Sequence, residues 1–200
     1  MTRRLKLAVL ISGRGSNLQA LIDACALPDF PAVIDLVVSN EPQAAGLDRA
    51  REAGLDTAVI NHRTFSSRAA FEQALDARLL DSGPDLICLA GFMRILGADF
   101  VRRWERRIIN IHPSLLPALK GLDTHARALE AGLREHGCTV HYVTAELDDG
   151  PAILQAKVPV LPDDTVESLA ARVLAEEHRI YPEAVRQLAE AAAVSRTTCQ

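Results

Sequence analysis

The sequence is poor in aromatic residues, which fill 4% of its 200 positions. Because 48% of the residues are hydrophobic, we expect a core built mainly from alanine, valine, leucine and isoleucine. A chain of this length fits one domain and buries roughly 70% of the surface that its unfolded form exposes. The sequence has no recognisable linker, repeat or low-complexity tract, so we expect a single domain over residues 1–193 and a frayed tail over 194–200.

An excess of positive charge is also missing, because the formal net charge is −4. Non-specific nucleic-acid binding needs basic patches that displace counterions, so we expect no nucleic-acid partner. The longest uncharged apolar run, 86–93, is too short to span a bilayer. The first apolar run is short, contains Lys6 and is followed by no small-x-small cleavage site, which argues against a signal peptide. We therefore expect a soluble, cytoplasmic protein that does not bind membranes.

Paired cysteines are absent too. No Cys-x-x-Cys motif and no metal-ligand spacing occurs among the four cysteines, which are Cys25, Cys88, Cys138 and Cys199. We interpret them as free thiols in a reducing compartment, and we predict no metal site.

Apolar runs alternate with helical patterns over the first half of the chain. Strands rich in β-branched residues are predicted at 5–12, 32–39, 56–60, 85–91 and 107–112. Stretches with helical spacing, such as 17–26 and 69–83, lie between the first four of these strands. This alternation predicts an α/β fold, with a Rossmann-like, mainly parallel sheet and helices on both faces.

The pattern changes after residue 112. A helix is predicted over 124–132, with Gly132 as its carboxyl-terminal signal. Two further strands are predicted at 138–145 and 152–160, joined by the hairpin-like turn sequence ELDDGP. We therefore expect an antiparallel addition to the parallel sheet.

The carboxyl-terminal segment 163–193 is predicted to be one long helix. Asp164 and Glu167 fit a capping box at its start. Pro182 lacks a backbone N–H group and is expected to kink or divide the helix.

The stretch SGRGSN lies between the first strand and the first helix, where backbone N–H groups and the helix dipole favour an anion. Gly13 and Gly15 permit close backbone approach, and Ser16 and Asn17 add side-chain donors. The dinucleotide fingerprint is incomplete because Leu18 stands in place of its third glycine, and no P-loop motif occurs. A single phosphate therefore fits better than a dinucleotide or ATP. The alternative is a glycine-rich turn without a ligand.

Asn110 and His112 stand two residues apart at the end of the fifth predicted strand, so their side chains point to the same face. Ligands of open α/β sheets bind at this carboxyl edge. An amide can donate a hydrogen bond to a developing oxyanion, and an imidazole can carry a proton. Asp148 in the ELDDGP turn is a candidate partner for the imidazole. The alternatives are a strand-end histidine that bonds to backbone groups and an acid that serves only the turn.

Four motifs occur in order over residues 5–185: SGRGSN, AGFMRIL, NIHPSLLP and ELDDGPAILQAKVPV. Together they closely resemble the phosphoribosylglycinamide formyltransferases, a family of the formyltetrahydrofolate-dependent formyltransferase superfamily. NIHPSLLP with a downstream aspartate is shared across the superfamily, and the other three motifs indicate this family. The resemblance implies formyl transfer from 10-formyltetrahydrofolate, as co-substrate, to the amine of glycinamide ribonucleotide in de novo purine biosynthesis.

The resemblance also implies residue roles. Asn110 would bind the formyl oxygen, His112 would stabilise the tetrahedral intermediate and help to move a proton, and Asp148 would support the imidazole. The implied phosphate and ribose site comprises Gly13, Gly15, Ser16, Asn17 and Glu177. The implied folate site comprises Arg68, Met93, Arg94, Ile95, Leu96, Asn110, Thr144, Ala145, Glu146, Leu147 and Asp148.

Several of these residues also have a purely structural interpretation. Met93 to Leu96 could be core packing, because apolar residues after a strand usually are. Arg68 could be an ordinary exposed arginine on a helix. Glu177 could be an acid at the edge of an apolar helical stripe.

Other functions remain open at this point. A 10-formyltetrahydrofolate hydrolase and a methionyl-tRNA formyltransferase share the superfamily motif, but they usually carry an additional amino-terminal or carboxyl-terminal domain, respectively. A non-catalytic phosphate-binding module is the alternative from a different class. Small molecules are the expected partners, and a homodimer is left open.

Overall fold

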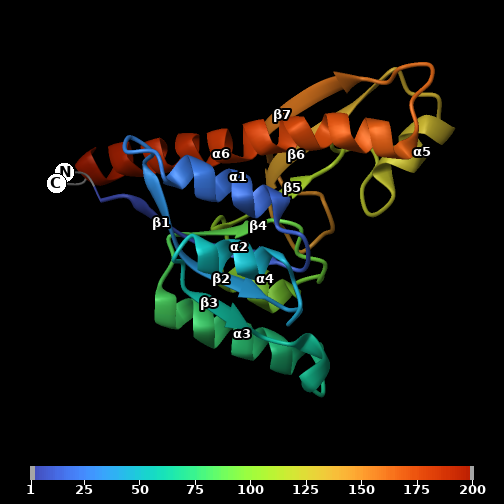
Figure 1. Cartoon of the computed structure of the whole chain (residues 1–200). Coiled ribbons are helices and arrows are strands. Elements are labelled where there is room, and N and C mark those ends of the chain that lie inside the picture. The colour runs from blue at the N-terminus through green and yellow to red at the C-terminus, as the bar shows by residue number, and fades with distance from the viewer. Residues whose placement is uncertain (1–2, 199–200) are drawn as a thin grey trace.

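A computed structural model describes residues 3–198 of the chain, which form an α/β fold around one seven-stranded sheet (Figure 1). The strands lie in the order β3-β2-β1-β4-β5-β6-β7. The first five are parallel, β6 is antiparallel to β5, and β7 is antiparallel to β6. The mainly parallel sheet with an antiparallel addition is confirmed. The strand bounds are β1 Leu5–Ile11, β2 Ala32–Ser39, β3 Thr57–Val59, β4 Leu86–Leu89, β5 Ile108–His112, β6 Glu135–Tyr142 and β7 Ala152–Pro159.

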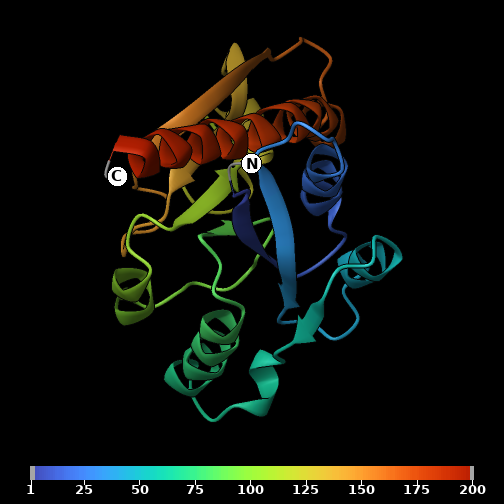
Figure 2. The same cartoon turned by 90° about the vertical axis from the view of Figure 1, so that its left-hand side faces the viewer.

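Helices cover both faces of the sheet, as the alternating pattern predicts (Figure 2). One face carries α1 (Ser16–Cys25), α2 (Gly46–Glu52), α5 (Thr124–Glu130) and α6 (Val166–Thr198). The other face carries α3 (Arg68–Ser82) and α4 (Ala98–Arg103). The sequence analysis did not predict α4 or the short 3₁₀ helix His62–Thr64, because elements of one or two turns are too short to show a hydrophobic period.

The residues of β1 supply both hydrophobic cores. Val9 and Ile11 pack in the cluster under α1 and α6, whereas Ala8 and Leu10 pack in the cluster under α3 and α4. A parallel strand that is buried on both faces is apolar on both, which explains the continuous apolar run from Leu7 to Ile11. The strand is therefore a rigid base for the loop that follows it.

The helix α6 differs from the sequence prediction in two ways. It passes through Pro182 as one undivided element. The capping box also lies one residue later than predicted, because Thr165 Oγ1 accepts from Ser168 N (3.2 Å) and Ser168 Oγ accepts from Thr165 N (3.0 Å). Asp164 instead forms a two-pronged ion pair with Arg172. The helix continues to Thr198, and positions 199–200 of the predicted frayed tail lie outside the described residues.

The thiols of Cys25, Cys88 and Cys138 are free, and Cys199 lies outside the described residues. Burial raises the pKa of the Cys25 thiol to about 11 and that of Cys138 to about 12, so both thiols stay protonated at neutral pH. Over residues 3–198, no helix is both long and apolar enough to cross a membrane. Within the same part of the chain, no group of three histidine, cysteine or acidic side chains is arranged to hold a metal ion.

Candidate active site

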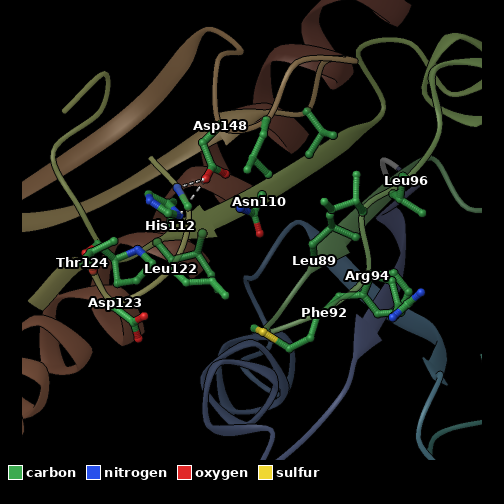
Figure 3. Close-up of a pocket in the computed structure, with 18 of the residues that line it drawn as sticks. Leu89, Phe92, Arg94, Leu96, Asn110, His112, Leu122, Asp123, Thr124 and Asp148 are labelled. Atoms are coloured by element: carbon green, nitrogen blue, oxygen red, sulfur yellow. Dashed lines mark hydrogen bonds and ion pairs between the residues drawn. The ribbon is translucent and has the colours of Figure 1, made fainter. Parts of the chain in front are cut away.

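A cavity of about 520 Å³ opens at the carboxyl edge of β4 and β5 (Figure 3). Asn110, His112 and Asp148 lie together on one side of it, and the segment that follows β4, with Phe92 and Arg94, lies on another. Most of the remaining wall is apolar or backbone, which is typical of a pocket for an organic ligand. It is completed by Leu89, Gly91, Met93, Ile95, Leu96, Ile111, Pro113, Gly121 to Ala126, Val143 to Leu147 and Val166.

Asn110 and His112 share one face of β5, and the antiparallel strand β6 places His141 and Thr139 directly opposite them. Asn110 Nδ2 lies 3.2 Å from His141 Nε2, and His141 Nδ1 lies 2.9 Å from the Tyr142 carbonyl oxygen. A carbonyl oxygen can only accept, so His141 carries its proton on Nδ1, and burial lowers its pKa and keeps the ring neutral. His141 Nε2 then accepts one amide hydrogen of Asn110 and leaves the other free for a ligand.

Asp148 reaches this site from the loop 143–151, which joins β6 to β7 and is longer than the predicted tight turn. Its carboxylate is 9% exposed, and Oδ2 lies 3.4 Å from His112 Nδ1. The same oxygen accepts a hydrogen bond from the Gly121 N–H (2.9 Å). Asp148 Oδ1 lies 3.7 Å from His141 Nε2. The fold therefore brings the acid and the imidazole together.

His112 has an acceptor beside each ring nitrogen. Nδ1 faces the carboxylate of Asp148, and Nε2 lies 3.0 Å from the carbonyl oxygen of Leu119. A carboxylate and a carbonyl oxygen only accept, so each is satisfied when the ring nitrogen beside it donates. Nε2 thus lies beside a position that a substrate oxygen would take over from Leu119.

The glycine loop lies two strands away, after β1. Gly15 has φ +72° and directly precedes α1, and a Cβ on it would lie 2.6 Å from Gly46 Cα of α2. Among residues 3–198 no side chain caps α1, so the N–H groups of its first turn are available for an anion. Asn17 Nδ2 donates to Glu177 Oε2 of α6 (2.6 Å).

Burial raises the pKa of the Glu177 carboxyl group. Asn17 Oδ1 is buried and has no hydrogen-bond partner within the described residues. Two acceptors therefore stand next to the glycine loop. A buried acid beside an unpaired acceptor is unusual where both serve only the structure. The arrangement therefore favours a ligand-binding role for Glu177 over a purely structural one.

The residues predicted to bind folate line the cavity, with the exception of Arg68. Arg68 lies beside a second cavity of about 220 Å³, whose wall also includes Arg94 and Ile95. Core packing does not describe Met93 or Ile95, whose exposed fractions are 66% and 64%. Leu96, which is 6% exposed, does belong to the core beneath the cavity.

Sequence reasoning missed several residues around His112. His141, Thr139, Leu119 and Gly121 all contact the site or the loop beside it. His141 and Thr139 alternate along one predicted strand, which is a signal that they share a face, but nothing in the sequence gives their register against β5. The backbone contacts of Leu119 and Gly121 have no side-chain signal at all.

A second pair of imidazoles closes one end of the cavity. His125 lines the wall, and His136 is buried behind it, with His136 Nε2 3.2 Å from His125 Nδ1. Burial, followed by the neighbouring His125 and His112, lowers the pKa of His136 to about 4. The pKa of His125 is lowered by the same causes, burial first and then His112. Both rings are therefore neutral near pH 7.

The sequence was compared with protein families and curated proteins. Residues 5–185 match the formyl transferase family. The chain is 51% identical over 178 residues to phosphoribosylglycinamide formyltransferase of Escherichia coli, a match that covers 89% of this chain and 84% of that protein. It is 50% identical over 190 residues to the trifunctional purine biosynthetic protein adenosine-3 of Bos taurus, covering 95% of this chain. The chain spans about a fifth of the length of that trifunctional relative (19%).

The chain is also similar in structure to solved formyltransferases. Glycinamide ribonucleotide transformylase 1 from Symbiobacterium toebii superposes with a TM-score of 0.92 at 52% identity, covering 94% of this chain and 89% of that one. Phosphoribosylglycinamide formyltransferase from Brucella melitensis superposes with a TM-score of 0.90 at 51% identity, covering 94% and 96%. The sheet order and the segments that carry the cavity are thus those of a solved fold.

Proposed function

Because this chain belongs to the formyl transferase family, we propose that it transfers a formyl group from 10-formyltetrahydrofolate to the amine of glycinamide ribonucleotide in de novo purine biosynthesis. The observation that carries the proposal is the convergence of Asn110, His112 and Asp148 on one side of a cavity at the carboxyl edge of the sheet. We further propose that residues 1–193 form a single formyltransferase domain. A homodimer stays a prediction, which sedimentation velocity would test.

The reaction is an acyl transfer between two nitrogens. The amine nitrogen of glycinamide ribonucleotide attacks the formyl carbon, a C–N bond forms, and the carbonyl electrons move to oxygen. The tetrahedral intermediate then breaks the bond to N10 of the folate, which leaves with a proton lost by the attacking nitrogen. The protein has to stabilise the oxyanion and to carry that proton.

The free amide hydrogen of Asn110 is suited to the oxyanion, since the other hydrogen is held by His141 Nε2. His112 would supply a second donor once Nε2–H turns from the Leu119 carbonyl to the substrate oxygen. Asp148 stabilises the imidazolium through Nδ1 and keeps the ring oriented. An ordered water is a suitable carrier for the proton between the two nitrogens.

The glycine loop is proposed to bind the substrate phosphate. Gly13 and Gly15 allow close approach, and the backbone of Ser16 and Asn17 at the start of α1 supplies N–H donors. Asn17 Oδ1 and Glu177 would accept from ribose hydroxyl groups. The loop and His112 follow strands two positions apart in the sheet, which separates them by about 10 Å and leaves room for a pentose and a short amide arm.

The apolar part of the cavity is proposed to hold the pterin of 10-formyltetrahydrofolate. Met93, Ile95 and Leu96 would supply apolar surface, and the segment Thr144 to Leu147 would close the opposite side, with Ala145 and Glu146 contributing backbone groups. Arg68, with Arg94, lines the second cavity next to this one, where two guanidinium groups suit the carboxylates of a folate tail.

The deciding experiment follows the release of tetrahydrofolate from 10-formyltetrahydrofolate, with and without glycinamide ribonucleotide. We expect release only when the ribonucleotide is present, and loss of at least about a hundredfold in turnover for His112→Ala, with binding largely retained. The matched control is His178→Gln, which removes a half-buried imidazole on α6 whose Nε2 has no partner within the described residues.

The other outcomes identify the alternatives. Release without any amine acceptor would make the protein a 10-formyltetrahydrofolate hydrolase. No release under either condition, with phosphate binding intact, would indicate a non-catalytic phosphate-binding module.

A further inference from the structure

Ser12 lies between the two loops that the proposed reaction uses. It follows β1 directly and precedes the glycine loop, and β1 lies between β2 and β4 in the sheet. Its backbone N–H donates to the carbonyl oxygen of Gly91 (3.1 Å), and its Oγ accepts from the backbone N–H of Met93 (2.8 Å). One residue thus makes two hydrogen bonds to the turn that begins the segment 91–96.

The hydroxyl group of Ser12 continues into a buried side-chain network. Ser12 Oγ lies 2.5 Å from Oδ1 of Asn40, a residue that follows β2 and is 2% exposed. Asn40 Nδ2 lies 3.1 Å from His62 Nδ1 in the 3₁₀ helix. The ring of His62 packs edge-on against Phe71 of α3. Residues from four separate segments therefore converge beneath the turn at 91–93.

The donors in this network can run in only one direction. A backbone N–H can only donate, so the Met93 amide uses a lone pair of Ser12 Oγ, and the hydroxyl proton goes to Asn40 Oδ1. This fixes the amide of Asn40 with its oxygen toward Ser12 and its nitrogen toward His62. His62 Nδ1 lies 3.1 Å from Asn40 Nδ2 and 3.2 Å from the Asn40 carbonyl oxygen, so the ring ends the chain at Asn40 in either tautomer. Each group satisfies the next, so the loss of one member leaves a polar group unpaired.

We propose that Ser12, Asn40 and His62 are positioning residues for the folate-binding segment 91–96, and that they fix its turn against the amino-terminal end of the glycine loop. Met93 ends this turn and Arg94 follows it, and both line the cavity proposed for the folate. The network touches neither reacting group, so it acts on the placement of the folate rather than on the chemical step. This inference rests on the proposed function where it concerns the KM for folate. The exchange rate of the Met93 amide tests the hydrogen bond to Ser12 without that assumption.

The test compares Ser12→Ala with Ser12→Thr, which keeps the hydroxyl group, and with Ser39→Ala. Ser39 is the matched control because it also lies at the end of a neighbouring strand and is fully buried, but its hydroxyl group bonds only to the backbone of Glu41. Asn40→Leu, which has a similar shape and no polar atoms, is a second variant that breaks the network without touching Ser12.

We expect Ser12→Ala and Asn40→Leu to raise KM for 10-formyltetrahydrofolate about tenfold, with kcat and KM for glycinamide ribonucleotide changed less than about threefold. Ser12→Thr and Ser39→Ala should both stay near wild type in the folate KM. Amide hydrogen exchange followed by NMR should show a faster-exchanging Met93 N–H in Ser12→Ala only, relative to Ser12→Thr and Ser39→Ala.

A folate KM within twofold of wild type in both network variants would overturn the proposal. A raised folate KM without faster exchange at Met93 would also overturn it, because the effect would then run through another route. If wild type shows no formyl transfer, the proposed function fails, and the exchange rates alone decide whether Ser12 holds the turn.

Discussion

The glycine loop and the two loops around His112 are held in different ways. The glycine loop has a glycine at its positive-φ position, and Gly15 packs on the backbone of Gly46, so its shape follows from the main chain. The loops around His112 instead hold Leu119, Asp123 and Asp148 at positive φ, a conformation that costs non-glycine residues free energy.

Side-chain contacts hold the strained loops in place. Asp148 accepts from the Gly121 N–H, Lys120 pairs with Asp149, and Arg127 donates to the Lys120 carbonyl (2.6 Å). A loop held by side-chain contacts can exchange one of them for a substrate contact. The glycine loop has no such contact to exchange at Gly15, because its shape follows from backbone packing against Gly46. We infer that the proposed phosphate site is fully built before its ligand arrives and that the proposed catalytic site is completed with the ligand.

The largest effect should come from the acid of the catalytic loop. Asp148→Asn removes the negative charge beside His112 Nδ1 but keeps the size and the tolerance for positive φ. We expect kcat to fall by about 10²- to 10⁴-fold, with little change in either KM. Steady-state kinetics with Asp149→Asn, an exposed neighbour in the same turn, is the control. Equal losses in both variants would show that the charge of Asp148 has no special role.

The second effect tests whether the glycine loop is built by its backbone. Gly15→Ala would place a methyl group 2.6 Å from Gly46 Cα at a residue with φ +72°. We expect a fall of about 2 to 3 kcal/mol in the free energy of unfolding, from strain and overpacking, and a KM for glycinamide ribonucleotide raised at least tenfold.

Gly54→Ala separates the two causes. Gly54 has φ +71°, but a Cβ there meets nothing within 4 Å. The free energy of unfolding of Gly54→Ala should fall by about 1 kcal/mol from backbone strain alone, and its kcat and KM values should stay those of wild type. Urea denaturation of both variants measures the difference, and an equal loss would mean that the contact with Gly46 adds nothing.

The smallest effect is a pH dependence of the free energy of unfolding that comes from His136, behind the cavity wall near His112. The pKa of His136 falls from 6.5 to about 4 on folding, so between these pH values the unfolded chain binds a proton that the folded chain does not. The free energy of unfolding should therefore decrease as the pH falls from 6.5 toward 4. His136→Gln should flatten this slope in urea denaturation at a series of pH values. A slope that the variant leaves unchanged would place the titration elsewhere.

The parallel sheet could be predicted from the sequence because its strands are buried on both faces. Every position of β1 from Leu7 to Ile11 is then apolar, and the run does not show the period of an amphipathic helix. The helix α4 has only six residues and gives no comparable period. Pro182 was expected to kink or divide α6, and it does not divide it, because the buried stripe on both sides, including Val173 and Ala189, holds one continuous helix.

The candidate site could be predicted only in part. Asn110 and His112 stand at a strand end where the two-residue spacing itself gives a shared face. The contact of His112 with Asp148 depends on a loop that folds back over the sheet, and the role of His141 depends on the register of β6 against β5. Neither contact follows from local spacing. Asp148 was indicated by its turn motif and by the family resemblance, whereas no motif indicated a role for His141.

The place of β1 in the sheet has a consequence for how the chain folds. Leu7 pairs on one side with Ile34 of β2, which is made soon afterwards, but on its other side with Leu86 of β4, far along the chain. Until β4 arrives, one edge of this largely apolar strand is open to pairing with any other chain. The slow step in folding should therefore be the closure of β1 against β4, and crowding of nascent chains should be most harmful before residue 89 has been made.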